Sequence, residues 1–403
     1  MNYQRMQVSE ELHNRFVMEV SDRSFMQTSY WAKLKQLNQW QSERIDVGDG
    51  EKILACAQIL YRRVGFWRIA YAPRAYLVSL DEPALLEALH REVLQFCKKE
   101  KIAALSIDPL QPVEDLDRLL ALYKPLGFQH EGLSTNLSQY FQPRFTMEVA
   151  LPDSDEALFA MFPGRTRSTI RRAESYELIF RDLGPEGLEA FSELMRITGE
   201  RDKFSIRDIS YFRALFDAFG EEHIHLFGVY VNPAKALAAE LRREAEILKI
   251  LRRQEKKVAR NPELSTEVEN LRRSLEKSES VQKVLREAGD EEILLASAIY
   301  LNFGRYSFYM YGASSQAIAE VQPCYFLQWE LMKRAISDDA LIYDLGGIDG
   351  DLTGDNGLYE FKQRFGTQIY ETLGQFVLPL KRLSWASFQA SLWLRKFIYS
   401  LRH

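Results

Sequence analysis

Apolar and polar positions alternate between two periods in the first part of the chain. Residues 52–61, 66–71 and 102–107 have the short apolar runs of strands, and residues 82–99 have the spacing of a helix. A second series begins with the strand-like residues 145–151 and continues into Ser154, a residue type that favours a helix start. Strands that alternate with helices are typical of α/β layer folds, so the sequence predicts two similar α/β halves.

The pattern changes between residues 234 and 289, where no aromatic side chain occurs. Apolar residues recur there mostly at spacings of three and four, and Asn261-Pro262 interrupts the helical period in the middle. We therefore predict two long helices folded back on each other as a hairpin. Residues 226–231 and 306–311 on either side have the pattern of buried strands, so the hairpin should project from the body between neighbouring strands.

Charge distinguishes the two arms of this hairpin. Residues 241–260 contain eight Lys or Arg against three Glu, a net charge of +5, whereas residues 261–290 contain five against seven acids, a net charge of −2. One interpretation is a solvated coiled coil whose charges pair across the two helices. The other is a contact with the phosphate backbone of a nucleic acid, with the basic arm as the contact surface. The candidate contacts on that arm are Arg252, Arg253, Lys256 and Lys257.

The C-terminal segment is basic and rich in aromatic residues. Residues 372–403 lack Asp and Glu but contain Lys381, Arg382, Arg395, Lys396 and Arg402. Among them, positions 390, 393, 394, 397, 398 and 401 are apolar at helical spacing. Two interpretations fit equally: a helix packed on the core, or an amphipathic helix attracted to an anionic membrane surface.

Composition excludes several classes of protein. The chain has 403 residues, 46% of them apolar and 27% charged, with a formal net charge of −5, so any site for a polyanion must be a local patch. Three scattered cysteines predict neither a disulfide framework nor a zinc site. The sequence has no GxGxxG, GxxxxGK[ST] or GxSxG motif, which argues against Rossmann, P-loop and serine-hydrolase sites. We expect no cofactor and no metal. Without a signal peptide or a long apolar run, we expect a cytosolic protein.

One region has the pattern of a ligand site. Tyr343-Asp-Leu-Gly-Gly predicts a strand that ends in a glycine-rich loop, and a short helix with Phe361 and Lys362 follows. This arrangement places a cation beside an aromatic ring where backbone can approach a ligand closely. The alternative is an ordinary tight turn with a capped helix.

These two motifs, Tyr-Asp-x-Gly-Gly and Phe-Lys-x-x-Phe-Gly, resemble the C-terminal signature of the FemABX aminoacyltransferases, which build the cross-bridges of bacterial peptidoglycan. Residues 71–74, 107–109, 165–173 and 198–207 are similar to the family in the same order, and the resemblance covers essentially the whole chain. The hairpin makes the chain more similar to the FemA and MurM types than to the short members.

The resemblance implies an α/β fold of two domains like those of the acyl-CoA N-acyltransferases (GNAT), with an inserted antiparallel coiled-coil hairpin. The expected bounds are residues 1–144 for the first domain, completed by residues 376–403. The second domain takes residues 145–234 and 290–375, and the arm takes residues 235–289.

The activity implied by the resemblance is transfer of an amino acid from aminoacyl-tRNA to a muropeptide precursor that is linked to a lipid or a nucleotide. An amine of the precursor attacks the ester carbonyl of the charged tRNA through a tetrahedral oxyanion, which a fixed cation stabilises. We expect a lipid-linked precursor, alanine or serine as the transferred residue with glycine as the alternative, and peripheral attachment to an anionic surface at the inner face of the cell membrane.

The resemblance also implies roles for single residues. Lys362 is similar to the family lysine that stabilises the intermediate, and Phe361 to a neighbour of the tRNA acceptor end. Asp108 matches an aspartate of the acceptor cleft, as a base or as a positioning group. The expected acceptor-binding residues are Lys35, with Lys33 as the alternative phosphate contact, Arg207 and Tyr211, which are four apart and so expected on one helical face, and Tyr311 on the cleft wall.

Two other functions are compatible with parts of this pattern. An acyl-CoA-dependent N-acyltransferase would share the fold, but the sequence lacks the Arg/Gln-x-x-Gly-x-Gly/Ala turn that binds pyrophosphate in such enzymes. A non-catalytic coiled-coil adaptor for RNA or membranes leaves residues 343–366 unexplained.

Overall fold

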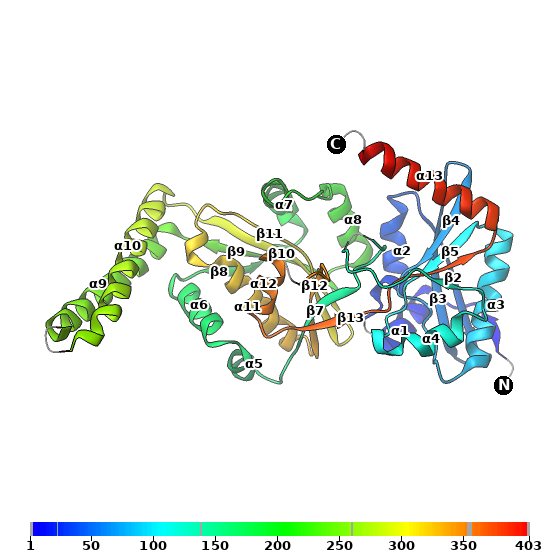
Figure 1. Cartoon of the computed structure of the whole chain (residues 1–403), viewed down its shortest axis with the longest axis horizontal. Coiled ribbons are helices and arrows are strands. Elements are labelled where there is room, and N and C mark those ends of the chain that lie inside the picture. Colours follow the sequence, from blue (N-terminus) through cyan, green and yellow to red (C-terminus); the bar gives the residue numbers. More distant parts are fainter. Residues whose placement is uncertain (1–2, 22, 138, 259–260, 353–356, 401–403) are drawn as a thin grey trace.

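The strands form two mixed sheets with helices packed on both faces of each (Figure 1), which confirms the predicted α/β class. The computed structural model describes residues 3–21, 23–137, 139–258, 261–352 and 357–400, and only the backbone of residues 262 and 392–400. The predicted domain bounds and the likeness of each half to a GNAT domain stay predictions.

The first sheet takes six strands from the N-terminal part of the chain and one from near its C-terminus. Its order is β1 (Gln4–Met6), β2 (Gln41–Gly48), β3 (Ile53–Val64), β4 (Trp67–Ala72), β5 (Ala104–Ile107), β14 (Phe376–Pro379) and β6 (Gln129–His130). The accompanying helices are α1 (Glu10–Val20), α2 (Ser29–Gln36), α3 (Pro83–Lys99) and α4 (Leu116–Tyr123). Only β4 and β5 pair in parallel, and the other neighbours are antiparallel.

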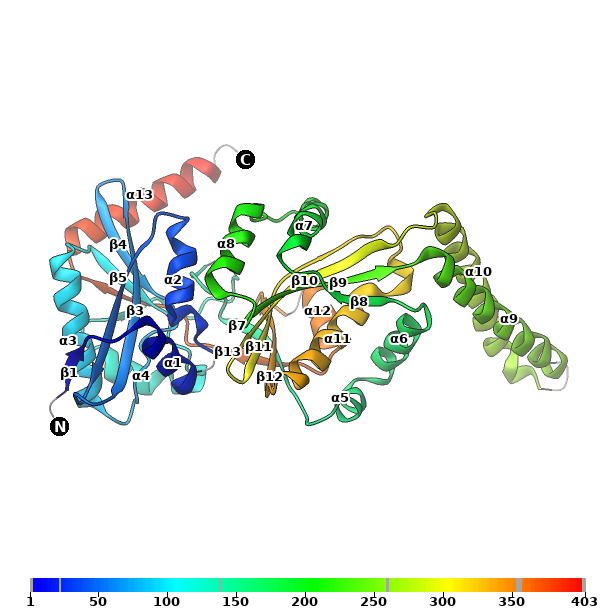
Figure 2. The same ribbon diagram turned by 180° about the vertical axis from the view of Figure 1, so that it is seen from behind.

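The second sheet has the order β13 (Gln368–Glu371), β7 (Phe145–Ala150), β12 (Ile342–Ile348), β11 (Tyr306–Ser314), β10 (Ile293–Phe303), β9 (Ile224–Val231) and β8 (Ile179–Asp182). On one face lie α5 (Asp155–Met161), α6 (Gly164–Ser175), α11 (Pro323–Ser337) and α12 (Gly357–Gln363), and on the other α7 (Leu188–Asp202) and α8 (Ile209–Phe219) (Figure 2). Ser154 caps α5 as predicted, since its side chain accepts a hydrogen bond from the Ala157 N–H.

One apolar cluster is shared by the two sheets. Successive side chains of a strand point to opposite faces, so Cys56 and Leu60 of β3 face α1 and α2, while Ala55, Ala57 and Ile59 face α3. The first of these faces continues across α8 into the second sheet. The short helix η1 (Phe25–Gln27) supplies the central ring: Phe25 lies 6.1 Å from Phe219 of α8 and 4.9 Å from Phe308 of β11, between ring centroids. The two halves are therefore packed as one body around this ring.

Two long helices follow β9 and project from the end of the second sheet (Figures 1 and 2). They are α9 (Pro233–Val258) and α10 (Ser265–Glu287), and side-chain bonds cross between them, such as Gln282 to Glu244 at 2.8 Å. The strand after the arm is β10, which pairs with β9 from Val231 and Ile293 onwards. The sequence prediction that residues 306–311 form the neighbouring strand was therefore wrong, because β10 lies between β9 and β11.

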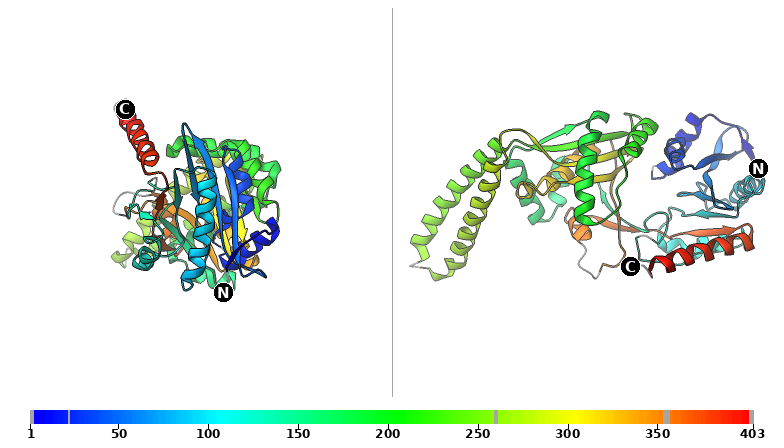
Figure 3. Two further views of the ribbon diagram at one scale, coloured as in Figure 1. Left: turned by 90° about the vertical axis from the view of Figure 1, so that its right-hand side faces the viewer. Right: turned by 90° about the horizontal axis from the view of Figure 1, so that it is seen from above.

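The last helix, α13 (Arg382–Ser400), runs along the first sheet beside the turn between β3 and β4 (Figure 3). Trp67 donates a hydrogen bond to Ser387 at 2.9 Å and packs against Phe388. Most of the apolar stripe predicted for this helix, together with Arg395, Lys396 and Arg402, lies outside the described side chains. No described helix is both long enough and apolar enough to span a bilayer.

We expect the outer part of the arm to be dispensable for folding. Its base is part of the core, because Ala236, Ala239, Val281 and Leu285 are buried against the second sheet. Replacing residues 246–276 with a short Gly/Ser linker leaves these contacts intact, and the entropy of loop closure depends only weakly on linker length, by about 0.6 kcal/mol per doubling. The melting temperature measured by calorimetry should then stay within a few degrees of the parent protein. Loss of cooperative unfolding would contradict the division of the arm into a base and a projecting part.

Candidate functional site

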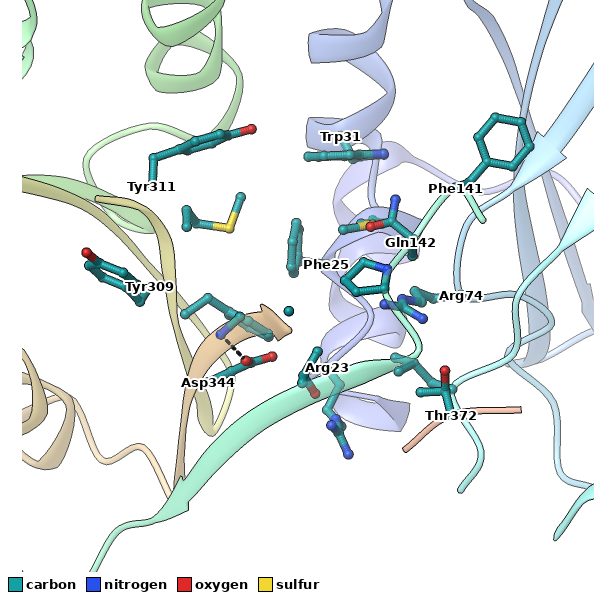
Figure 4. Close-up of a pocket in the computed structure, with 18 of the residues that line it drawn as sticks. Arg23, Phe25, Trp31, Arg74, Phe141, Gln142, Tyr309, Tyr311, Asp344 and Thr372 are labelled. Atoms are coloured by element: carbon teal, nitrogen blue, oxygen red, sulfur yellow. Dashed lines mark hydrogen bonds between the residues drawn. The ribbon is translucent and has the colours of Figure 1, made fainter. Parts of the chain in front are cut away.

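A central pocket of about 330 Å³ lies between the two sheets (Figure 4). Its first wall is η1, α2 and the turn after β4, with the segment around Gln142. Its second wall is the start of α8, strand β11 and the end of β12. The shared apolar cluster around Phe25 forms its floor, so the packing of the two halves also fixes the distance between the walls.

Two cations, one from each wall, line the central pocket. Lys35 of α2 lies over the Trp31 ring at 4.1 Å, and Arg207 lies over the Tyr211 ring at 5.2 Å. Neither forms an ion pair with any residue that the structure describes. Burial, and secondarily the charge of Arg207, lower the pKa of Lys35 to about 8. Two unneutralised cations in one pocket repel each other and favour a ligand with at least two negative charges.

The structure also separates Lys35 from its alternative. Lys33 lies on the other face of α2, where it pairs with Glu10 at 3.0 Å, and it does not line the central pocket. Arg207 precedes Asp208, the residue that caps α8, so Arg207 and Tyr211 do not share a helical face as predicted. They are neighbours because the Arg207 side chain folds back over the tyrosine ring.

Tyr211 and Tyr311 close one side of the pocket together. Tyr211 is buried, and its hydroxyl lies 3.0 Å from the Tyr311 hydroxyl, which brings α8 and β11 together. Each hydroxyl can donate to the other or to a ligand. The sequence prediction that Tyr311 is on the cleft wall agrees with this position.

Asp108 lies behind the pocket wall. Its buried carboxylate accepts hydrogen bonds from the Tyr71 hydroxyl at 3.0 Å and from the Arg74 N–H at 2.8 Å, and it pairs with the Arg74 guanidinium at 3.4 Å. Burial raises the pKa of this carboxyl, against the effect of Arg74. Arg74, rather than Asp108, lines the pocket, so the geometry favours a positioning group over a base.

The second wall opens where two parallel strands separate. β11 and β12 pair through three residue pairs, of which Phe308 and Asp344 are the last. Beyond this point Asp344 accepts a hydrogen bond from the Gly346 N–H at 2.6 Å. Gly346 has a φ of +84°, and a Cβ at Gly347 would lie 2.6 Å from Pro143. Both positions of the Gly-Gly motif therefore require glycine, one for its backbone conformation and one for close packing.

Lys362 connects this opening to a second cavity. The side chain is 4% exposed, and its ammonium donates to the Gly347 carbonyl at 2.9 Å, directly behind the central pocket. Burial lowers its pKa to about 8, against the effect of Asp344. Lys362, Phe361 and Tyr309 line a side cavity of about 710 Å³ between α7 and α12, and Tyr309 lines the central pocket as well. The ammonium therefore lies on the boundary between two cavities.

The candidate contacts on the arm form a separate surface. Arg252, Arg253, Lys256 and Lys257 are exposed on one side of α9, and none of them forms an ion pair with a described residue. Glu255, in contrast, faces α10 and pairs with Arg272 at 2.7 Å. Glu255 thus pairs away from these four cations, so this contact across the hairpin does not neutralise them.

Among the described residues, one cluster has the residue types of a metal site. It is the buried group His13, Asp46 and Cys56. Nδ1 of His13 hydrogen-bonds to Asp46 at 2.6 Å, and Nε2 to the Gln27 carbonyl at 2.8 Å. Both ring nitrogens are already engaged in hydrogen bonds, so the cluster ties α1 to η1 and to β2.

Comparison with known proteins identifies the family. The FemAB family model matches residues 8–391. The chain belongs to the FemAB family. A lipid II:glycine glycyltransferase of Staphylococcus aureus (strain MRSA252) is 33% identical over 387 residues, which are 93% of this chain and 92% of that protein. The corresponding enzyme of strain USA300 is 32% identical over the same shares. The crystal structure of FemX superposes with a TM-score of 0.78 and 31% identity, covering 95% of this chain and 99% of FemX.

Sequence reasoning missed several residues of this FemAB pocket. Asp344 and Arg74 stand inside motifs that carry the resemblance, so the signal was present, but other residues of those motifs were singled out. Arg23 had no signal, because it comes from a turn outside those motifs, whereas Trp31 lies one helical turn before Lys35 in the segment from which only the lysines were singled out. Arg23 forms an ion pair with Glu148 and lies 3.7 Å from the Tyr370 ring centroid, so its charge is already compensated.

We expect anion binding in the central pocket to weaken above about pH 8. Lys35 must be protonated to bind, so affinity should fall by up to about tenfold per pH unit above its pKa. A diphosphate diester is the suitable probe, because its own charge is constant in this range. Calorimetric titration of the parent protein should show the slope, and Lys35→Met should bind weakly with a flat profile. Lys33→Met, on the other face of α2, is the matched control and should keep the slope. An equal slope in Lys35→Met would place the titrating group elsewhere.

Proposed function

We propose that this chain transfers an amino acid from aminoacyl-tRNA to the amine of a lipid-linked peptidoglycan precursor. The observation that carries the proposal is the position of Lys362 between two cavities. A transferase that joins two large substrates needs a separate approach for each and one point where the reacting atoms meet. The central pocket, the side cavity and the boundary at Lys362 supply these three elements.

The central pocket fits the acceptor. In a lipid-linked precursor a diphosphate joins the sugar to the lipid, and Lys35 and Arg207 present two uncompensated cations to such a group. Tyr211 and Tyr311 offer hydroxyls beside it for a sugar. The precursor's peptide would then extend toward Asp344 and the Gly-Gly turn, which brings its terminal amine to the boundary.

The side cavity fits the aminoacyl end of the donor. Its lining is mainly apolar, with Phe361 packed edge-on against Tyr325 at 5.5 Å between ring centroids. A partly exposed aromatic ring next to a cation suits an adenine ring and an ester group. The basic side of α9 would contact the tRNA farther from the reacting ester.

The reaction requires no covalent enzyme intermediate. The neutral amine forms a C–N bond to the ester carbonyl carbon, and the resulting oxyanion is stabilised by the Lys362 ammonium. Collapse of the intermediate breaks the C–O bond to the tRNA ribose, whose hydroxyl takes up the proton released by the amine. Asp344, whose pKa is raised by burial, is the carboxyl nearest to this path that lines the central pocket.

Glycine is the amino acid that we propose. The sequence alone favours alanine or serine, but the relatives that are 32–33% identical are named for glycine. Since those relatives are also named for lipid II, we propose a lipid-linked acceptor and peripheral action at the inner face of the cell membrane. The donor's identity as a charged tRNA rests on the arm and on the family resemblance.

Replacing the boundary cation should impair chemistry more than binding. Lys362→Met keeps the aliphatic stem, and turnover should fall about a hundredfold or more, the usual effect of removing one oxyanion donor. Single-turnover transfer measures the rate, and diphosphate-diester affinity should stay within about twofold because Lys362 does not line the central pocket. Lys124→Met, an exposed lysine of the first half, is the matched control. Turnover near that of the parent would exclude Lys362 from the reaction.

Neutralising the basic side of the arm should weaken tRNA binding. Changing Arg252, Arg253, Lys256 and Lys257 to Gln should lower affinity for full-length tRNA and reduce the slope of log affinity against log salt, by about 0.7–0.9 per lost phosphate contact. Transfer from a short acceptor-stem mimic should change little, because such a donor does not reach α9. Lys277→Gln with Lys283→Gln, on α10, is the control pair. Equal losses with both donors would show that the arm acts on the fold rather than on tRNA.

A further inference from the structure

Two apolar side chains are far more exposed than any other large apolar side chain in the described part of the chain. Phe66, in the turn between β3 and β4, is 92% exposed, and Leu383, in the first turn of α13, is 89% exposed. The next is Leu37, at 51%. Isolated exposed leucines are ordinary, but nearly complete exposure of a phenylalanine and a leucine at one edge is not.

The two side chains belong to one surface. Trp67, next to Phe66, donates a hydrogen bond to Ser387, which is one helical turn after Leu383 and therefore on the same side of α13. The Trp67 ring also packs on Phe388 at 5.5 Å between centroids. Two views of the ribbon show the β3–β4 turn and the start of α13 side by side (Figures 1 and 2). The hydrogen bond and the ring contact hold this edge rigid while Phe66 and Leu383 point outward.

Cations surround this edge, and acids are rare in the segments that form it. The sequence has no Asp or Glu from residue 52 to 80 or from residue 372 to 403, although the whole chain has a net charge of −5. Arg63, Lys381 and Arg382 are exposed, and Lys381 reaches the Lys101 carbonyl at 3.2 Å. We call Phe66, Leu383, Arg63, Lys381 and Arg382 the tip patch.

Contacts connect the strand that leads to the tip patch with the helix that carries Lys35. Trp40 donates its backbone N–H to the Lys35 carbonyl at 3.3 Å, and its ring lies under the Arg62 guanidinium at 4.6 Å. Arg62 lies two residues before the end of β3, and Phe66 is in the turn that follows this strand. A diphosphate held at Lys35 would thus be near any surface that the tip patch contacts.

We propose that the tip patch docks this protein on an anionic lipid surface, with Phe66 and Leu383 inserted at the boundary between headgroups and acyl chains and the three cations on the phosphates. This inference rests on the proposed function, which supplies the reason for docking: a lipid-linked acceptor is confined to the bilayer. It assigns the docking to the β3–β4 turn as much as to α13.

Charge and side-chain type favour lipid over the alternatives. A nucleic acid would be attracted by the cations, but a projecting leucine has no ring to stack on a base. A protein partner would be expected to offer a pocket for two separate apolar points, whereas a bilayer accepts them without a fixed geometry. Anionic headgroups complement a basic rim on an otherwise acidic protein.

Vesicle co-sedimentation with the full chain tests the proposal, in the absence of tRNA and precursor. The parent protein should bind vesicles of equal parts phosphatidylcholine and phosphatidylglycerol much more tightly than pure phosphatidylcholine. Phe66→Asp with Leu383→Asp should weaken binding at least about tenfold. Arg63→Gln, Lys381→Gln and Arg382→Gln together should weaken it about a hundredfold. Because these side chains are exposed, the melting temperature should not change, and Leu341→Asp, at an exposed leucine directly before β12, should bind like the parent.

Transfer assays separate this proposal from the proposed function. The tip-patch variants should transfer normally to a water-soluble acceptor and poorly to a precursor embedded in vesicles. Unchanged binding of the variants to anionic vesicles would overturn the docking proposal, whatever the enzyme's activity. Loss of tRNA affinity with unchanged vesicle binding would overturn it too, and would assign the patch to RNA.

Discussion

The arrangement of the site depends on the point where β11 and β12 stop pairing. A parallel ladder that ends inside a sheet leaves backbone groups that must find other partners. Here the Asp344 carboxylate accepts a hydrogen bond from the Gly346 N–H, and the Lys362 ammonium donates a hydrogen bond to the Gly347 carbonyl. The same two side chains that satisfy the opened backbone are the charged groups on either side of the boundary between the cavities. Their burial, which shifts both pKa values toward the neutral forms, is a direct consequence of this position.

The second constraint is the shared apolar cluster, which sets the two walls of the central pocket at a fixed distance. Phe25 contacts aromatic rings of both halves, so α2 with Lys35 and the start of α8 with Arg207 are positioned by the same packing. In the proposed function this rigidity has a purpose, because a diphosphate can bridge two cations only if their separation is maintained. The cations repel each other in the free protein, and the hydrophobic cluster opposes that repulsion. Binding of an anion would relieve it, which links acceptor binding to the stability of the interface.

Sequence reasoning reached the α/β class, three strands of the first sheet (β3, β4 and β5) and the pair of long helices, because each depends on local periodicity. It reached Phe361 and Lys362 through a compact motif, and Arg207 and Tyr211 through the family resemblance. It could not show that β10 separates β9 from β11, or that Arg207 precedes its helix, because both depend on where elements end. Arg23 was not singled out because its segment joins the others only in the folded pocket, whereas Arg74 lies inside a motif of the resemblance and was passed over. The roles of all these residues stay predictions until they are tested by substitution.

The most direct test of the account is transfer between the two proposed substrates in a defined mixture. Purified protein would be given tRNA charged with radiolabelled glycine and a lipid-linked peptidoglycan precursor, and label in the extracted lipid would be measured against time. The account predicts that label moves from tRNA to the precursor, and that acyl-CoA esters neither replace the charged tRNA nor compete with it. Acylation of the precursor from an acyl-CoA, with no transfer from the charged tRNA, would contradict it.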